Sequence, residues 1–149
     1  MDYDFFTGSP ALFAQSSIYK VNRDSAQSAN INRNQKAEMG VEIKGPIDVS
    51  FYWKVSSQAG RDFLRVTVYD NNFSPTSMTQ RISGERDWAL AEMRIPAGNY
   101  FLIWDYTKNG SVDAGADAGW IDNIEIGCPS RNVEPKMTSV SSLIMLLLD

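Results

Sequence analysis

The clearest pattern in this sequence is the alternation of apolar and polar residues along residues 47–55. Every odd-numbered position of this segment, from Ile47 to Val55, is apolar, whereas the polar residues Ser50 and Lys54 stand at even-numbered positions. A period of two is typical of an antiparallel strand that buries one face and leaves the other partly solvated. The segment therefore predicts a strand whose odd-numbered side chains face a core.

Further segments of the same character follow one another along the chain. They cover residues 17–21, 37–43, 62–70, 78–82, 88–95, 99–108 and 120–126. Turn residues separate them, among them Gly45-Pro46 and Pro96-Ala97-Gly98, which we take as strand boundaries. No segment shows a helical period. The expected fold is therefore all-β, a two-sheet antiparallel jelly-roll β-sandwich over residues 1–127.

The segments between these strands differ in character. Residues 22–36 are polar and predict an exposed loop with room for one short strand, whereas residues 109–119 are rich in glycine and predict a second loop. Residues 99–108 are apolar on both faces, which indicates a central strand.

The pattern changes after residue 127. Residues 128–149 predict a linker followed by an apolar strand or anchor stub, which ends in the six apolar residues 143–148. That run is too short to span a bilayer. Three roles stay open for it: a strand donated to a neighbouring subunit, a strand of its own domain, or the stub of a membrane anchor. The first residues show no basic segment followed by an apolar stretch, so no signal peptide is expected in this sequence.

Composition excludes several classes of function. The 149 residues are 43% hydrophobic and carry a net charge of −4, with no basic stripe that could neutralise nucleic-acid phosphates or anionic lipids. The chain has one cysteine and no histidine. An internal disulfide, a cysteine-based zinc site and histidine-dependent triads are therefore excluded.

Catalytic motifs are also missing from the sequence. No nucleophile elbow, phosphate-binding loop or metalloprotease string occurs, and the carboxylates are not grouped in a readable acid–base pair. We therefore expect a protein that is not an enzyme.

Four strings, taken in order, resemble a known module. They are FYWKVSS at residue 51, ISGERDW at residue 82, IPAG at residue 95 and GSVDAGADAGWIDN at residue 110. The chain is similar over residues 3–127 to extracellular jelly-roll modules of bacterial surface and secreted proteins, of the MAM and carbohydrate-binding (concanavalin-like) type. This resemblance implies a non-catalytic module that binds carbohydrate or another surface ligand outside the cell or on its surface.

Aromatic residues outside the expected core are the candidate ligand-binding residues, because an aromatic ring matches the C–H face of a pyranose. Trp88 follows a turn, and Tyr52, Tyr69 and Phe101 lie opposite the apolar faces of their strands. The last three are expected to line one concave sheet. The other tryptophans fall on apolar strand faces and are expected in the core.

Asp122 is the candidate for a structural metal. In a regular strand it would share an apolar face with Trp120 and Ile124, and a carboxylate there needs a partner. The resemblance implies calcium, with partners near the N-terminus such as Asp4. The alternative is a bulge that turns Asp122 outward, or backbone N–H groups that bind it. Asp113 and Asp117 predict either turn chemistry or a second cation site.

Two functions follow from these observations. The first is a binding or adhesion module for carbohydrate or a cell-surface ligand. The alternative is a structural subunit of an extracellular filament, assembled by donation of the C-terminal strand.

Overall fold

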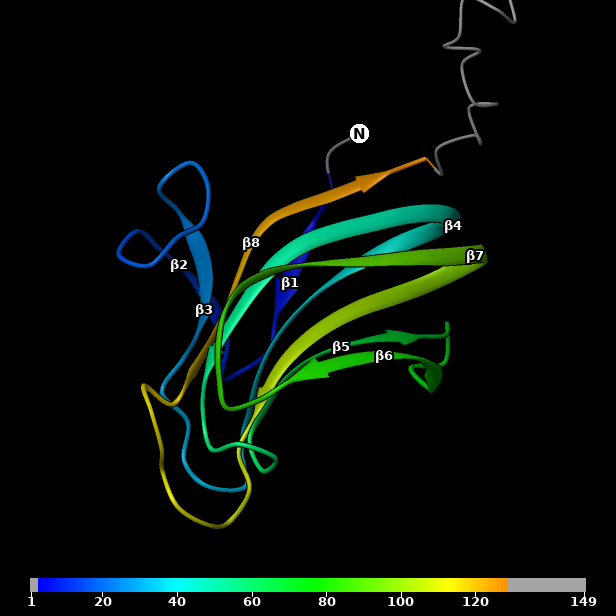
Figure 1. The fold of residues 1–149 in the computed structure, drawn as a ribbon. Helices are drawn as coiled ribbons and strands as arrows, with labels where there is room; N and C mark the ends of the chain where they lie inside the picture. Colours follow the sequence, from blue (N-terminus) through cyan, green and yellow to red (C-terminus); the bar gives the residue numbers. More distant parts are fainter. Residues whose placement is uncertain (1–2, 129–149) are drawn as a thin grey trace, which may run out of the picture.

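The computed structural model describes residues 3–128, which contain β-strands and no helix (Figure 1). The strands are β1 (Phe5–Thr7), β2 (Leu12–Gln15), β3 (Ser25–Ser28), β4 (Lys36–Ser56), β5 (Phe63–Tyr69), β6 (Pro75–Ile82), β7 (Glu85–Thr107) and β8 (Ala118–Gly127). All the pairings between these strands are antiparallel. The predicted all-β antiparallel sandwich is confirmed.

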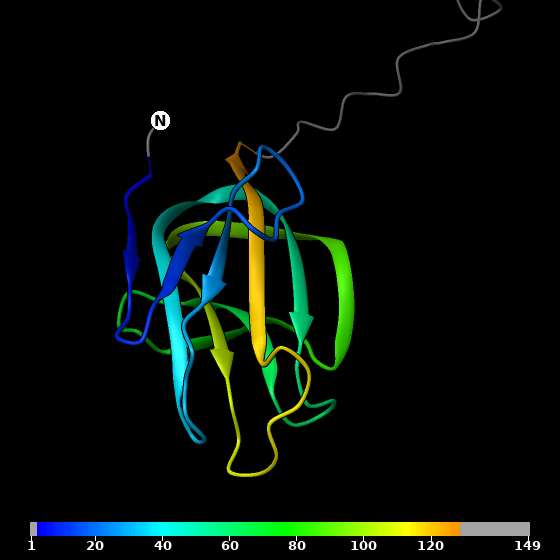
Figure 2. The same cartoon turned by 90° about the vertical axis from the view of Figure 1, so that its left-hand side faces the viewer.

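The long strands β4 and β7 run through both layers of the sandwich. They pair with each other along almost their whole length, and both turn back at the same place (Figure 1). We call the first layer β1, β5, β6 and residues 36–44 of β4 with residues 99–107 of β7. The second layer contains β2, β3, β8 and the remaining halves of β4 and β7, with β8 between β3 and β4 (Figure 2).

The core lies between the two halves of this folded pair. The odd-numbered apolar residues of β4 are buried on both sides of the bend, as the alternation predicts. Phe51 of the second layer meets Trp104 of the first edge to face, with ring centroids 5.4 Å apart. This contact joins the layers at the centre of the molecule.

The two strand boundaries predicted at Gly45-Pro46 and Pro96-Ala97-Gly98 are wrong, because β4 and β7 continue through the bend there. Gly45 pairs with Gly98 and Ile47 pairs with Ile95, so β7 carries one residue more than β4 at this point. Such a bulge lets a strand bend and continue instead of ending. It also changes which residues of β7 face the core. Odd-numbered residues such as Ile95 face it before the bulge, and even-numbered residues such as Leu102 face it afterwards.

The expected strand at residues 17–21 is wrong. β2 ends before this segment and β3 begins after it, within the expected loop 22–36. Side chains bind the backbone instead: Gln15 Oε1 accepts hydrogen bonds from the N–H groups of Ser17 and Ile18, and Asp122 Oδ2 accepts from those of Lys20 and Val21. One local side-chain acceptor, Gln15, and one distant acceptor, Asp122, thus replace a strand partner.

The expected linker and apolar C-terminal strand, residues 128–149, fall outside the described residues apart from Cys128, which is exposed. Their role stays a prediction, as does the domain boundary at residue 127. Within residues 3–128 there is no helix long and apolar enough to cross a membrane.

The close packing at the bend predicts that Gly45→Ala destabilises the fold. A Cβ at Gly45 would lie 1.7 Å from the backbone oxygen of Pro96. Because Gly45 and Pro96 stand on the paired strands β4 and β7, we expect the free energy of unfolding to fall by about 3 kcal/mol. Urea unfolding followed by tryptophan fluorescence measures it. Gly127→Ala is the control, because a Cβ there meets nothing within 4 Å; equal effects of the two substitutions would refute the role of the bend.

Candidate functional site

The structure places the candidate aromatic residues on two different layers. Tyr69 of β5 and Phe101 of β7 are register partners in the first layer. Tyr52 lies in the second layer on β4, and Trp88 lies on the second-layer half of β7. All four are partly exposed, but Tyr52 does not share one concave face with Tyr69 and Phe101 as expected. The bend of β4 and β7 separates them.

A cluster of aromatic rings forms on the outer side of the first layer. Phe101 stacks on Phe73 at a centroid distance of 4.1 Å and an angle of 15°, and Phe6 meets Phe101 edge to face at 6.4 Å. Phe73 is 57% exposed and Phe6 is 41% exposed. Together with Tyr69 we call these rings the aromatic patch. Neighbouring exposed apolar rings of this kind mark an interaction site more often than scattered single residues do.

Phe6 reaches the aromatic patch because of Gly40. The two residues are register partners, and a Cβ at Gly40 would lie 2.5 Å from Cζ of the Phe6 ring. The missing side chain of Gly40 therefore makes room for the ring of the neighbouring strand. No sequence pattern links two positions so far apart in the chain.

Phe73 is held by a short turn after β5. Asp70 Oδ1 accepts hydrogen bonds from the N–H groups of Asn72 (2.8 Å) and Ser74 (2.9 Å). Phe73 has a φ of 55°, a left-handed conformation that is unusual for a bulky residue. Strain of this kind persists where surrounding contacts enforce it and is found often at functional sites. The sequence DNNFSP indicates a turn but not the direction of its phenyl ring.

A groove of about 910 Å³ borders the aromatic patch. Phe6 and Phe101 line it together with the polar residues Glu42, Lys44 and Asn99. Within residues 3–128 these three polar side chains make no hydrogen bond or ion pair with another residue that would occupy them. A groove that combines aromatic rings with available polar groups is suited to a ligand with both C–H and hydroxyl surfaces.

The Asp122 carboxylate is occupied by backbone N–H groups, one of the alternatives that the sequence left open. The N–H groups of Lys20 and Val21 lie 2.6 and 2.8 Å from Oδ2. The pairing of β8 with β4 shifts next to Asp122, where Asn123 has a φ of 50°. The regular strand in which Asp122 shares a face with Ile124 is therefore wrong, because the irregularity interrupts the alternation.

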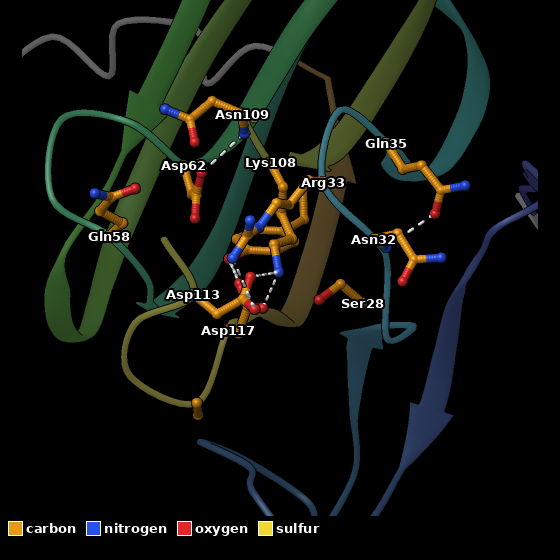
Figure 3. Close-up of polar contacts among 12 residues, drawn as sticks. Ser28, Asn32, Arg33, Gln35, Gln58, Asp62, Lys108, Asn109, Asp113 and Asp117 are labelled. Atoms are coloured by element: carbon orange, nitrogen blue, oxygen red, sulfur yellow. Dashed lines mark hydrogen bonds and ion pairs between the residues drawn. The ribbon is translucent and has the colours of Figure 1, made fainter. Parts of the chain in front are cut away.

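Asp113 and Asp117, which were expected to support a turn or a second cation site, both bind the ammonium of a lysine (Figure 3). The ammonium of Lys108, whose side chain is only 4% exposed, lies 2.6 Å from Asp113 and also contacts Asp117. Tyr106 donates a hydrogen bond of 2.8 Å to Asp117. Burial lowers the pKa of Lys108, but the two carboxylates outweigh it and the pKa is raised. The hydrogen bond with Lys108 lowers the pKa of Asp113. The loop is therefore closed by an internal cation.

The candidate calcium ligands do not come together among the described residues. Asp4 borders the groove before β1, Asp122 lies on β8, and Asp113 and Asp117 share Lys108. No group of three or more carboxylate or thiol side chains within residues 3–128 is placed to hold a metal ion. Calcium binding stays a prediction that the geometry does not support.

Comparison with known proteins relates this fold to binding and adhesin domains. No protein-family model and no curated protein matches the sequence. Among solved structures, the chain is similar to the K1 cleaved adhesin domain of Lys-gingipain from Porphyromonas gingivalis W83, with a TM-score of 0.56 and 12% identity. The match covers 85% of this chain and 90% of that domain. The carbohydrate-binding module TmCBM61, solved with β-1,4-galactotriose, matches with a TM-score of 0.50 and 9% identity, over 83% of this chain and 86% of the module.

A larger secreted protein contains the same fold as one part. The secreted serine protease VesC from Vibrio cholerae matches with a TM-score of 0.59 and 16% identity, over 83% of this chain but only 24% of the protease. At these identities the likeness is one of fold. It confirms the expected resemblance to carbohydrate-binding modules at that level, whereas the expected likeness to MAM domains receives no support.

The ion pair in the loop predicts an acid-sensitive contribution to stability. The pKa of Asp113 is lower in the folded than in the unfolded chain. The pair with Lys108 therefore contributes its full stabilisation at pH values above 3.8, the ordinary pKa of an aspartate. That contribution is lost as the pH falls through the lowered pKa. We expect Asp113→Asn to lower the melting temperature at about pH 5 and to have a smaller effect as the pH falls to about 2.5.

Circular dichroism at both pH values measures the difference. Asp24→Asn is the control, because Asp24 is exposed and makes no ion pair among residues 3–128. A destabilisation by Asp113→Asn that stays constant with pH would contradict the ionic role of Asp113.

Proposed function

We propose that this chain is a non-catalytic carbohydrate-binding module that holds a glycan against the aromatic patch and the adjoining groove. The observation that carries the proposal is the pair of stacked rings at the surface of the first layer, Phe73 over Phe101. An exposed ring presents a flat apolar face, which suits the C–H face of a pyranose.

The polar residues of the groove supply the second requirement. Glu42 offers acceptors, Lys44 offers donors, and Asn99 offers both, so that sugar hydroxyls find partners beside the aromatic rings. These side chains stand on paired strands instead of loops: Glu42 is the register partner of Phe101, and Lys44 is the partner of Asn99. A rigid base of this kind lowers the entropy cost of holding a ligand.

The comparisons support binding in preference to catalysis. The whole-length counterparts described above are a carbohydrate-binding module and an adhesin domain, whereas the protease contains the fold as a quarter of its chain. TmCBM61 was solved with a galactose oligosaccharide, which makes β-1,4-linked galactose oligosaccharides a reasonable first probe. Since one counterpart belongs to a secreted protein, the module is proposed to work outside the cell.

The filament role has no observation in its favour among the described residues. Self-association through the C-terminal segment therefore stays a prediction.

The proposal predicts that Phe73→Ala weakens glycan binding without unfolding the protein. Glycan-array screening of the wild type identifies ligands, and isothermal titration with β-1,4-galactotetraose or the strongest array ligand gives the affinity. We expect a loss of about tenfold, equal to about 1.4 kcal/mol, because truncation removes an exposed stacking surface.

Phe13→Ala is the matched control, because Phe13 is 46% exposed on β2 of the second layer. It should leave the affinity within about twofold of wild type. A wild-type protein that binds no glycan, or equal losses for the two variants, would sink the proposal.

A further inference from the structure

Two arginines face each other across neighbouring strands of the first layer. Arg65 of β5 and Arg81 of β6 are register partners, and both point to the outer side because the alternate residues Leu64 and Val66 are fully buried. Like charges directly opposite each other on a sheet are destabilising unless something neutralises them. The neighbours of these guanidinium groups therefore decide what the pair can bind.

Arg65 is neutralised from within the layer. Its Nε and Nη2 lie 3.2 and 3.1 Å from Oδ2 of Asp105, which is its register partner on β7 and is only 1% exposed. Burial raises the pKa of Asp105, an effect that Arg65 partly offsets. Both contacts use one edge of the guanidinium. The remaining N–H groups of Arg65 are available for a second partner.

Arg81 has no carboxylate partner among residues 3–128. Its guanidinium lies over the ring of Phe63, 4.3 Å from the centroid, which fixes its position without neutralising its charge. The carboxylate of Glu38, the register partner of Asp105 on β4, is paired with Lys36. An exposed guanidinium that is held in place but lacks an anion is suited to planar recognition of a carboxylate or sulfate.

The arginine pair lies on the same outer side as the aromatic patch. Tyr69, Thr67 and Arg65 succeed one another on this side of β5. At a rise of about 3.3 Å per strand residue, Tyr69 and Arg65 are about 13 Å apart along the strand. This separation corresponds to a short oligosaccharide, so a glycan lying along β5 from the patch would bring its next sugars over the arginines.

We propose that the module selects glycans bearing an anionic substituent, a uronate carboxylate or a sulfate, which Arg65 and Arg81 bind together beside the aromatic patch. The inference rests on the proposed function, because the aromatic patch must first hold the sugar chain. It adds a second requirement that a neutral glycan does not meet.

The test compares ligands that differ only in charge. On an array with neutral, uronate-bearing and sulfated oligosaccharides, we expect the strongest signals from the anionic members. Titration with tetragalacturonate, with its methyl ester and with a sulfated galactan oligosaccharide separates the two sources of negative charge. The methyl ester keeps the sugar and linkage but removes the charge, and we expect it to bind at least about tenfold more weakly than the acid.

Arg81→Gln is the decisive variant, because it leaves the buried pair of Arg65 and Asp105 intact. We expect it to weaken binding of the preferred anionic ligand about tenfold and to leave neutral glycans unchanged. Arg81→Lys should recover only part of the affinity, since an ammonium cannot form the paired contacts. Arg86→Gln, an exposed arginine of the second-layer half of β7, is the matched control and should bind like the wild type.

The outcomes separate this inference from the proposed function. Equal binding of charged and neutral glycans, with no effect of Arg81→Gln, would overturn anion selection and leave glycan binding standing. Binding of no glycan at all would overturn both. A charge preference lost in Arg81→Gln but kept in Arg86→Gln supports the inference, whichever anion is preferred.

Discussion

The pairing of β4 with β7 is the constraint on which the rest of this structure depends. The two strands stay hydrogen-bonded while they pass from one layer to the other, so a single ladder connects the two halves of the sandwich. Every other strand adds to this pair directly or through one neighbour, apart from β2, which adds through β3 and β8. The ring contact of Phe51 with Trp104 then closes the core between the halves.

The bulge in this pair also determines what the two outer surfaces present. Because β7 gains one residue at Pro96–Gly98, Phe101 and Asp105 turn outward after the bend, and the core positions pass to Leu102 and Trp104. A regular continuation of the strand would have buried the aromatic ring on which the candidate site is built. One inserted residue thus provides both the bend of the strand and the outward position of the ring at the candidate site.

The alternation along the chain was sufficient to predict the fold class and most of the core. Residues 47–55 and 62–70 follow a period of two, and the structure buries the predicted apolar faces. Irregular backbone could not be predicted in this way. The bulges at Pro96–Gly98 and Asn123 change the facing of the residues that follow, and side-chain hydrogen bonds replace a strand at residues 17–21.

The candidate site was predicted only in part, for a similar reason. The alternation of residues along each strand placed Tyr69 and Phe101 outside the core, as observed. It could not show which layer each half of a long strand joins. Phe6 and Phe73 come from distant segments. Phe6 reaches Phe101 because Gly40 has no side chain in its way, and Phe73 reaches it because Asp70 holds the turn by hydrogen bonds. Contacts of this range depend on tertiary packing, which local patterns do not encode.

The shortness of β1 has a consequence for how affinity arises. This strand has three residues, all exposed, and it pairs with β4 alone. The ring of Phe5, tilted against Trp104 at 6.3 Å, helps to hold it. Short, exposed strands with a single partner open locally at low free-energy cost. Because Phe6 lines the groove, a ligand held there would bind with its intrinsic affinity multiplied by the fraction of molecules in which β1 is docked. Such a ligand and β1 would stabilise each other, so that the docking of a three-residue strand would set the strength of recognition.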